Sequence, residues 1–284
     1  MDIVFIDETF DLNQTRNYHI SIQAGLSGYS FSVLDPVRNK YILLKHFVFR
    51  PEEMSPVLLE EKIDEIHGND EFLEREYKTV LFSYQSPKYT LIPAPLFNKQ
   101  NLRTFFEFNH ILDDLDQIYY NEYKSIDAYN LFVVPSELSN IVYKSFRNVK
   151  FFHQVTPLIE NGLINHGKRN SYKSVIANLY GNYMDILAIR GDKLLLCNTF
   201  PLKNEEDLVY FVLYVYEQLK LKGEETPLFI SGEMQKNSHA FDLLKSYIKN
   251  IGFEKRNNNF LYSYTFDETD SHLFANLFNL RMCV

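Results

Sequence analysis

Residues 174–233 read SVIANLYGNYMDILAIRGDKLLLCNTFPLKNEEDLVYFVLYVYEQLKLKGEETPLFISGE, a succession of short apolar runs separated by turn residues. Val175–Leu179 is the first run, and the Gly181-Asn182 pair behind it supplies the positive φ that a two-residue hairpin turn needs. Two more runs, Met184–Ile189 and Leu194–Cys197, are separated by a Gly-Asp turn. The stretch therefore begins with a predicted antiparallel meander of three strands.

A helix and a further strand are predicted to follow this meander. Asn204 is positioned to cap the helix, and three acidic residues in its first turn favour the helix dipole. Apolar residues recur at helical spacing up to Leu219, and we expect Gly223 to end the helix in the left-handed conformation. Leu228–Ile230 then predicts a buried strand parallel to the first strand of the meander. This order is typical of an α/β fold and resembles the core of a ribonuclease H-like domain.

The same order of elements is predicted in the first half of the chain. A shift of 153 residues lays Ile22–Glu53 over Val175–Glu206 without a gap and gives nine identities. Gly28 coincides with Gly181 in this alignment, and we expect both to lie in a hairpin turn. Chance similarity between two meanders is the alternative explanation. The alignment nevertheless predicts an internal duplication of one domain.

The chain divides at residues 165–171, a polar, glycine-containing connection. We expect an N-terminal extension at residues 1–17, a first ribonuclease H-like domain at 18–165 and a second at 172–284. Elsewhere, we expect Ser136 to cap a helix and residues 260–266 to form a strand.

Composition and charge limit the kinds of partner. The 284 residues carry a formal net charge of −8 without a Lys/Arg cluster, which argues against a binder of nucleic-acid phosphates. No run of eighteen apolar residues predicts a membrane span, and the N-terminal residues lack the pattern of a secretion signal. The two cysteines, Cys197 and Cys283, are too few for a disulfide framework or a metal site of their own, and they favour a reducing cytoplasm.

Two ribonuclease H-like halves in one chain resemble the superfamily of actin, sugar kinases and heat-shock chaperone ATPases. The bacterial members that act in pilus assembly and cell division are the most similar. The chain is also similar to a family of Bacteroidetes proteins that share a domain of unassigned function. The resemblance to the actin-like proteins runs from Tyr18 to the end in the order of elements. It implies an actin-like ATPase fold with a nucleotide cleft between two domains.

In that superfamily the first turn of each meander carries an Asp-x-Gly phosphate motif. Residues 20–30, ISIQAGLSGYS, match the first motif, with Gln23 or Gly25 in the place of the acid. Residues 175–183, VIANLYGNY, match the second, with an amide for the Asp and Tyr180 for a Gly. Residues 228–233, LFISGE, resemble the Gly-Gly adenosine motif, with an acid for the second Gly. The resemblance places these residues at the cleft: Gln23, Gly25, Ser27, Gly28, Asn178, Gly181, Asn182, Asp185, Gly232 and Glu233.

The departures from these motifs change the chemistry that the cleft can support. Mg²⁺ prefers carboxylate oxygens beside substrate phosphates, and an amide offers no charge and no base. We therefore expect no cofactor, no catalysis, and a degenerate nucleotide site on a cytoplasmic module that binds a protein partner or acts as a scaffold. The alternative is an ATP- and Mg²⁺-dependent ATPase or kinase-like enzyme that uses displaced acids such as Asp185 and Glu233. A nuclease is disfavoured because it needs several carboxylates around two metal ions.

Overall fold

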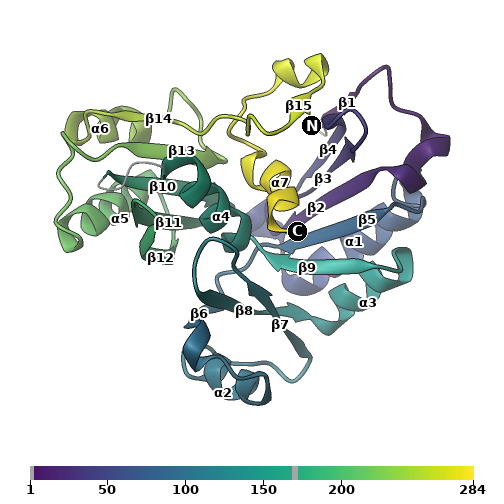
Figure 1. Ribbon diagram of the computed structural model, residues 1–284, viewed down its shortest axis with the longest axis horizontal. Helices are drawn as coiled ribbons and strands as arrows, with labels where there is room; N and C mark the ends of the chain where they lie inside the picture. The colour runs from purple at the N-terminus through teal and green to yellow at the C-terminus, as the bar shows by residue number, and fades with distance from the viewer. Residues whose placement is uncertain (1–2, 168–171) are drawn as a thin grey trace.

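A computed structural model describes residues 3–167 and 172–284, which form two large β-sheets and one small sheet (Figure 1). The first sheet has the strand order β1-β4-β3-β2-β5-β9, with β15 paired to β4. Its strands are β1 (Ile3–Ile6), β2 (His19–Gly25), β3 (Gly28–Asp35), β4 (Lys40–Val48), β5 (Thr79–Tyr84), β9 (Val149–His153) and β15 (Leu261–Tyr262). Residues 1–2 of the predicted extension and 168–171 of the predicted connection lie outside the described residues.

The second sheet has the strand order β12-β11-β10-β13-β14. Its strands are β10 (Lys173–Tyr180), β11 (Tyr183–Arg190), β12 (Lys193–Pro201), β13 (Leu228–Gly232) and β14 (Ile251–Phe253). The predicted meander, the Asn204 cap and the parallel pairing of β13 with β10 are all confirmed. In both sheets the three meander strands lie next to one another, and the first of them pairs in parallel with the strand after the crossover helix.

Helices cover one face of each sheet. In the first half α1 (Pro56–Asn69) and α3 (Ser136–Ser145) pack together, and in the second half α5 (Glu205–Gln218) and α6 (His239–Tyr247) do the same. Alternate side chains of β10 point to these helices, which is why Val175 and Ala177 share an apolar core with α5 and α6. Ile176 lies on the opposite face, so this strand is buried on both sides.

Helices α4 (Val155–His166) and α7 (Ala275–Asn279) lie between the large sheets (Figure 1). Helix α4 packs on β11 of the second sheet, and α7 contacts β2 and β3 of the first sheet and β13 of the second. The chain then ends in a 3₁₀ helix, Leu280–Cys283. Within the described ranges no helix combines the length and the apolar character that crossing a membrane requires.

A small sheet is inserted in the first half, between β5 and α3. It has the order β6-β8-β7, with β6 at Tyr89–Pro93, β7 at Asp116–Glu122 and β8 at Ala128–Pro135. The short helix α2 (Leu102–Glu107) packs on β6 and β8. The insertion lies below the two large sheets in Figure 1, and its chain connections lead directly to the junction between the halves.

The two meanders correspond less simply than the ungapped alignment predicts. Gly25 pairs with Gly28 across a two-residue loop, as Tyr180 pairs with Tyr183 across Gly181-Asn182, so the first hairpins match at an offset of 155. Strands β4 and β12 match at 153, because the loop between β3 and β4 is two residues longer. The prediction that Gly28 lies in the turn is therefore wrong. A Cβ there would lie 2.7 Å from the backbone oxygen of Phe47, so Gly28 allows β4 to approach.

Three local predictions also differ from the structure. Helix α5 ends before Gly223, and Lys220 takes the left-handed conformation with φ of 51°. Ser136 does not cap α3; its hydroxyl donates to the carbonyl oxygen of Leu115. Residues 260–266 contain only the two-residue strand β15, followed by a 3₁₀ helix from Tyr264 to Glu268. The end of α5 is closed by local backbone bonds, such as the one from the N–H of Leu221 to the carbonyl oxygen of Tyr216, whereas Ser136 and β15 are bonded to distant segments.

Candidate functional site at the junction of the hairpin turns

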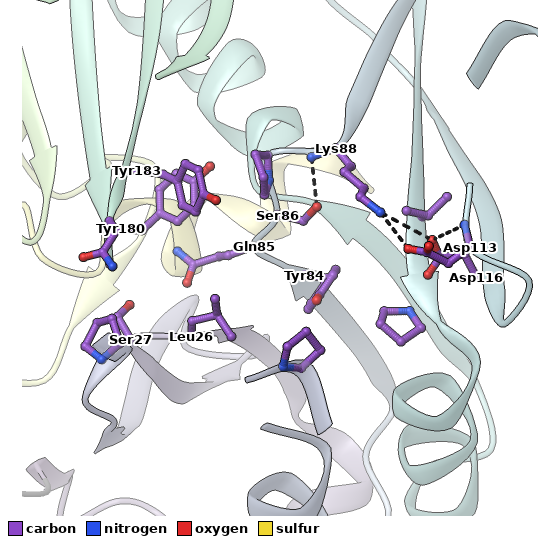
Figure 2. Close-up of a pocket in the computed structure, with 17 residues that line it drawn as sticks. Leu26, Ser27, Tyr84, Gln85, Ser86, Lys88, Asp113, Asp116, Tyr180 and Tyr183 are labelled. Carbon is purple, nitrogen blue, oxygen red and sulfur yellow. Dashed lines mark hydrogen bonds and ion pairs between the residues drawn. The ribbon is translucent and has the colours of Figure 1, made fainter. Parts of the chain in front are cut away.

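A cavity of about 400 Å³ lies where the hairpin turns of both halves meet the small sheet (Figure 2). The β2–β3 turn contributes Leu26 and Ser27, and the β10–β11 turn contributes residues 180–183. The end of β5 and the loop after it, residues 84–88, form a third wall, and the remaining lining residues are Pro51, Pro56, Asp113, Asp116, Val133 and Pro135. Most of the lining is aromatic or apolar, and four prolines contribute to it.

The ten residues predicted at the cleft divide into three groups. Ser27, Gly181 and Asn182 line the cavity. Gly232 and Glu233 lie beside the two turns, to which Glu233 is hydrogen-bonded. The remaining five lie on strands next to the turns and do not line the cavity: Gln23, Gly25, Gly28, Asn178 and Asp185.

Two amide side chains predicted at the cleft, Gln23 and Asn178, occupy matching positions in the two sheets. Gln23 pairs with Ser30 on the next antiparallel strand, in the same register as Asn178 pairs with Asp185. Each amide also has a serine beside it on the parallel strand, Ser83 in one half and Ser231 in the other. Among the described residues neither Gln23 Oε1 nor Asn178 Nδ2 has a hydrogen-bond partner. Gln23, and not Gly25, is therefore the residue that corresponds in strand register to Asn178.

Asp185 is fully buried at the centre of a hydrogen-bonded chain. Its Oδ1 accepts bonds from the hydroxyl groups of Thr199, at 2.5 Å, and Tyr180, at 3.1 Å. Gln154, which begins α4, donates to the Tyr180 hydroxyl at 2.8 Å and also bonds to the backbone of Ser86 on the cavity wall. This chain therefore connects the core of the second sheet with the loop that follows β5.

Burial raises the pKa of Asp185 to about 7, against the opposing effect of the hydrogen bonds from Thr199 and Tyr180. Burial and the nearby carboxylate together hold the pKa of Tyr180 well above its usual value. The Tyr180 side chain lines the cavity, and its hydroxyl points inward to Asp185. A molecule in the cavity would meet this ring before it reached the carboxyl group.

Glu233 joins the turns of the two halves. Its Oε1 accepts a hydrogen bond from Ser27 Oγ at 2.5 Å, and its Oε2 accepts one from the backbone N–H of Gly181 at 3.0 Å. Burial of the carboxylate raises its pKa, and the bonds from Ser27 and Gly181 oppose that shift. As a residue Glu233 is still exposed, so the carboxylate lies at a crowded rim that solvent reaches.

Charged groups at the opposite side of the cavity are paired with one another. Lys88 Nζ lies 2.9 Å from Asp113 and 3.9 Å from Asp116, and Figure 2 shows both contacts as dashed lines. Burial raises the pKa of Asp116. No three side chains of His, Cys, Asp or Glu within residues 3–167 and 172–284 are grouped as ligands for a metal ion.

Sequence reasoning missed the wall formed by residues 84–88 and the acids of the small sheet. No motif marks these residues, and they come together at the cavity only through the tertiary fold. The sole local signal was the Ser86-Pro87 pair directly after a strand.

Comparison with known proteins identifies the family. The family model described as "Protein of unknown function (DUF3822)" matches residues 7–251. The chain belongs to this family. A search of curated proteins found no match.

Solved structures confirm the fold of this DUF3822 protein. A crystal structure from Bacteroides thetaiotaomicron, described as a protein with an actin-like ATPase fold and unknown function, is 25% identical in sequence. The match covers 87% of this chain and 94% of that one, with a TM-score of 0.79. The PilM-PilN type IV pilus biogenesis complex contains a chain that matches at 11% identity, with coverage of 94% and 98% and a TM-score of 0.63. The predicted actin-like ATPase fold of two ribonuclease H-like halves is therefore confirmed.

Proposed function

We propose that this DUF3822 protein is a non-catalytic actin-like module that binds a segment of a protein partner in the cavity between its hairpin turns. The observation that carries the proposal is the pair of amides, Gln23 and Asn178, at matching positions next to the two turns. Neither position offers a carboxylate to a metal ion, so a magnesium nucleotide lacks its usual ligands there.

The acids that remain near the cavity are engaged elsewhere. Asp113 and Asp116 are paired with Lys88, Glu233 holds the two turns, and Asp185 lies behind the Tyr180 ring. Phosphoryl transfer depends on charge stabilisation and positioning, and carboxyl groups that are paired with a lysine, bonded to the turns or buried behind a ring supply little of either. These contacts support the loss of nucleotide chemistry.

The lining of the cavity supports a protein segment as the ligand. Tyr84, Tyr180 and Tyr183 lie around it, together with four prolines. Grooves with aromatic walls favour extended, proline-containing segments because these lose little conformational entropy on binding. PilM, which shares the fold, is found in a complex with PilN, and this also supports partner binding. Three exposed apolar side chains near Asp113 extend the surface available to a partner: Phe108, Ile111 and Leu115.

We also propose that the two halves arose by an internal duplication, with domains at residues 18–165 and 172–284 after an extension at 1–17. The shared order of five strands, β4-β3-β2-β5-β9 in one sheet and β12-β11-β10-β13-β14 in the other, and the matched amides support this. The C-terminal strand β15 pairs with β4, so the end of the second domain would complete the first. Two free cysteines among the described residues are in keeping with a reducing, cytoplasmic setting.

Calorimetry with ATP and ADP, each with and without Mg²⁺, tests the loss of nucleotide chemistry. We expect no heat of binding and no change in Tm at millimolar nucleotide, because matched amides replace the motif acids. A magnesium-dependent rise in Tm would contradict the proposal. If hydrolysis were also measured and were lost in Asp185→Asn, the alternative enzyme with displaced acids would be favoured.

Photo-crosslinking from Asn182 in cells, followed by mass spectrometry, tests the partner. Asn182 is exposed and lines the cavity, so a photoreactive residue there reports on what enters it. We expect one protein to be captured and its yield to fall about tenfold in Tyr183→Ser, since aromatic side chains carry much of the energy of such contacts. Tyr210→Ser, in an exposed residue of α5, is the matched control and should leave the yield unchanged. Equal yields in both variants would contradict binding in the cavity.

A further inference from the structure

We propose that Glu233 is an internal anionic ligand, whose carboxylate fills an anion site built from both hairpin turns and so fastens the two halves together with a group of the chain itself. The inference rests on the contacts of Glu233 alone and holds whether or not the cavity binds a protein partner.

The two donors of the site come from different halves of the molecule. Ser27 Oγ belongs to the β2–β3 turn and donates to one carboxylate oxygen, while the Gly181 N–H belongs to the β10–β11 turn and donates to the other. None of the ion pairs among the described residues involves Glu233. Its charge is therefore balanced by an O–H and an N–H dipole, which is how a backbone turn binds an anion.

The backbone around Glu233 is shaped to present the side chain to these donors. Gly232 has φ of 77°, and a Cβ at this position would lie 2.0 Å from the carbonyl oxygen of Leu179. Only glycine fits such a conformation and approach without displacement. The N–H of Glu233 then donates to that same carbonyl oxygen at 3.0 Å, which fixes the residue beside the end of β10. The backbone bond to Leu179 thus positions the Glu233 side chain so that its carboxylate reaches both turns.

The turns are close enough for one small anion to reach both. A Cβ added at Gly181 would lie 3.6 Å from the Cβ of Ser27, which is van der Waals contact. Ser27 is buried, whereas Glu233 as a residue is exposed. Truncating Glu233 would leave both donors unpaired at a rim that a dissolved anion can reach. The structure thus predicts chemical rescue, in which an added anion takes the place of the missing carboxylate.

Thermal unfolding of Glu233→Ala in sodium acetate, sodium phosphate or sodium chloride at equal ionic strength tests this. We expect acetate or phosphate to raise its Tm by about 2–4 °C over chloride, because an anion that binds only the folded state stabilises it. Rescue by acetate alone assigns a carboxylate-sized site, and rescue by both assigns one that also accepts a phosphate. Wild type, Ser27→Ala/Glu233→Ala and the exposed-loop control Glu224→Ala should respond equally to all three salts. The proposal is overturned if Glu233→Ala gains no more than these three proteins do.

Hydrogen exchange provides a second test that does not depend on truncation, in case Glu233→Ala does not fold. Glu233→Gln keeps the size of the side chain but offers one acceptor oxygen in place of two. We expect amides in residues 24–30 and 178–184 to exchange about threefold faster or more in this variant, in both turns together, with Glu224→Gln unchanged. Unchanged exchange in both turns would mean that the carboxylate does not join the halves.

Discussion

Asp185 is a carboxyl group that folding removes completely from solvent, and its pH dependence is the first prediction. Its folded-state pKa is raised to about 7 from 3.8, so the folded protein holds a proton that the unfolded chain releases between these values. The free energy of unfolding should therefore fall as pH rises from about 4 to 7, by roughly 4 kcal/mol at most from this group, and level off above it.

Asp185→Asn tests this, because an amide oxygen can still accept from Thr199 and Tyr180 without ionising. We expect the free energy of unfolding of the variant minus that of wild type to be larger at pH 8 than at pH 4.5. Urea unfolding of both proteins at both pH values measures this difference. Buried histidines with lowered pKa values, such as His153, destabilise both proteins equally in acid and cancel in the difference. Parallel curves for the two proteins would show that Asp185 does not titrate in this range.

Single residues of the site could be predicted from sequence only in part. Gly181 and Asn182 were predicted because turn chemistry marks a hairpin there, whereas Ser27 was named only because the resemblance to the superfamily places a phosphate motif at this point of the chain. The bond between Ser27 and Glu233 spans 206 residues, and no local pattern contains it. Gln154 was missed for the same reason, since its role depends on where α4 begins relative to Tyr180 and Ser86.

At the scale of elements, two glycines are predicted to have opposite effects when replaced by alanine. Gly68 lies near the end of α1 with open space around it, so Gly68→Ala should stabilise the protein by about 0.5–1 kcal/mol through helix propensity. A Cβ at Gly223 would lie 2.1 Å from the carbonyl oxygen of Tyr247, so Gly223→Ala should destabilise it by about 1–3 kcal/mol. Urea unfolding of both variants measures the difference. If both variants changed the stability equally, Gly223 would not be required for the close contact with the backbone of Tyr247.

The same glycine shows why elements were easier to predict than their ends. The meander, the Asn204 cap and the start of α5 follow from periodicity and from side chains close in sequence, which the chain displays directly. Gly223 is a residue type that often ends a helix. The close contact that requires a glycine there is with Tyr247, at the end of α6 and beyond the next strand in the sequence. Leu26-Ser27 forms a two-residue turn without a turn signature, because the flanking strands and Glu233 hold it.

At the scale of the whole molecule, α7 is positioned to make the two halves unfold together. Phe278 on α7 is 1% exposed, packs against the ring of Tyr41, and lies in a core cluster of the first half; its backbone oxygen accepts a bond from the Tyr41 hydroxyl at 2.6 Å. The same helix contacts β13 of the second sheet. Loss of the Phe278 ring should therefore destabilise both large sheets.

Phe278→Ala is expected to lower the free energy of unfolding by about 3–5 kcal/mol, the usual cost of a large cavity in a core. Because α7 contacts both sheets, amides of β2–β4 and of β10–β13 should lose protection at the same urea concentration, as followed by hydrogen exchange and mass spectrometry. Phe108→Ala removes the same kind of side chain at an 88% exposed position. It should change the free energy of unfolding by no more than about 0.5 kcal/mol and leave the exchange protection of both sheets as in wild type. If β10–β13 kept wild-type protection while β2–β4 opened, the halves would be independent units, and Glu233 would join two bodies that each fold without the other.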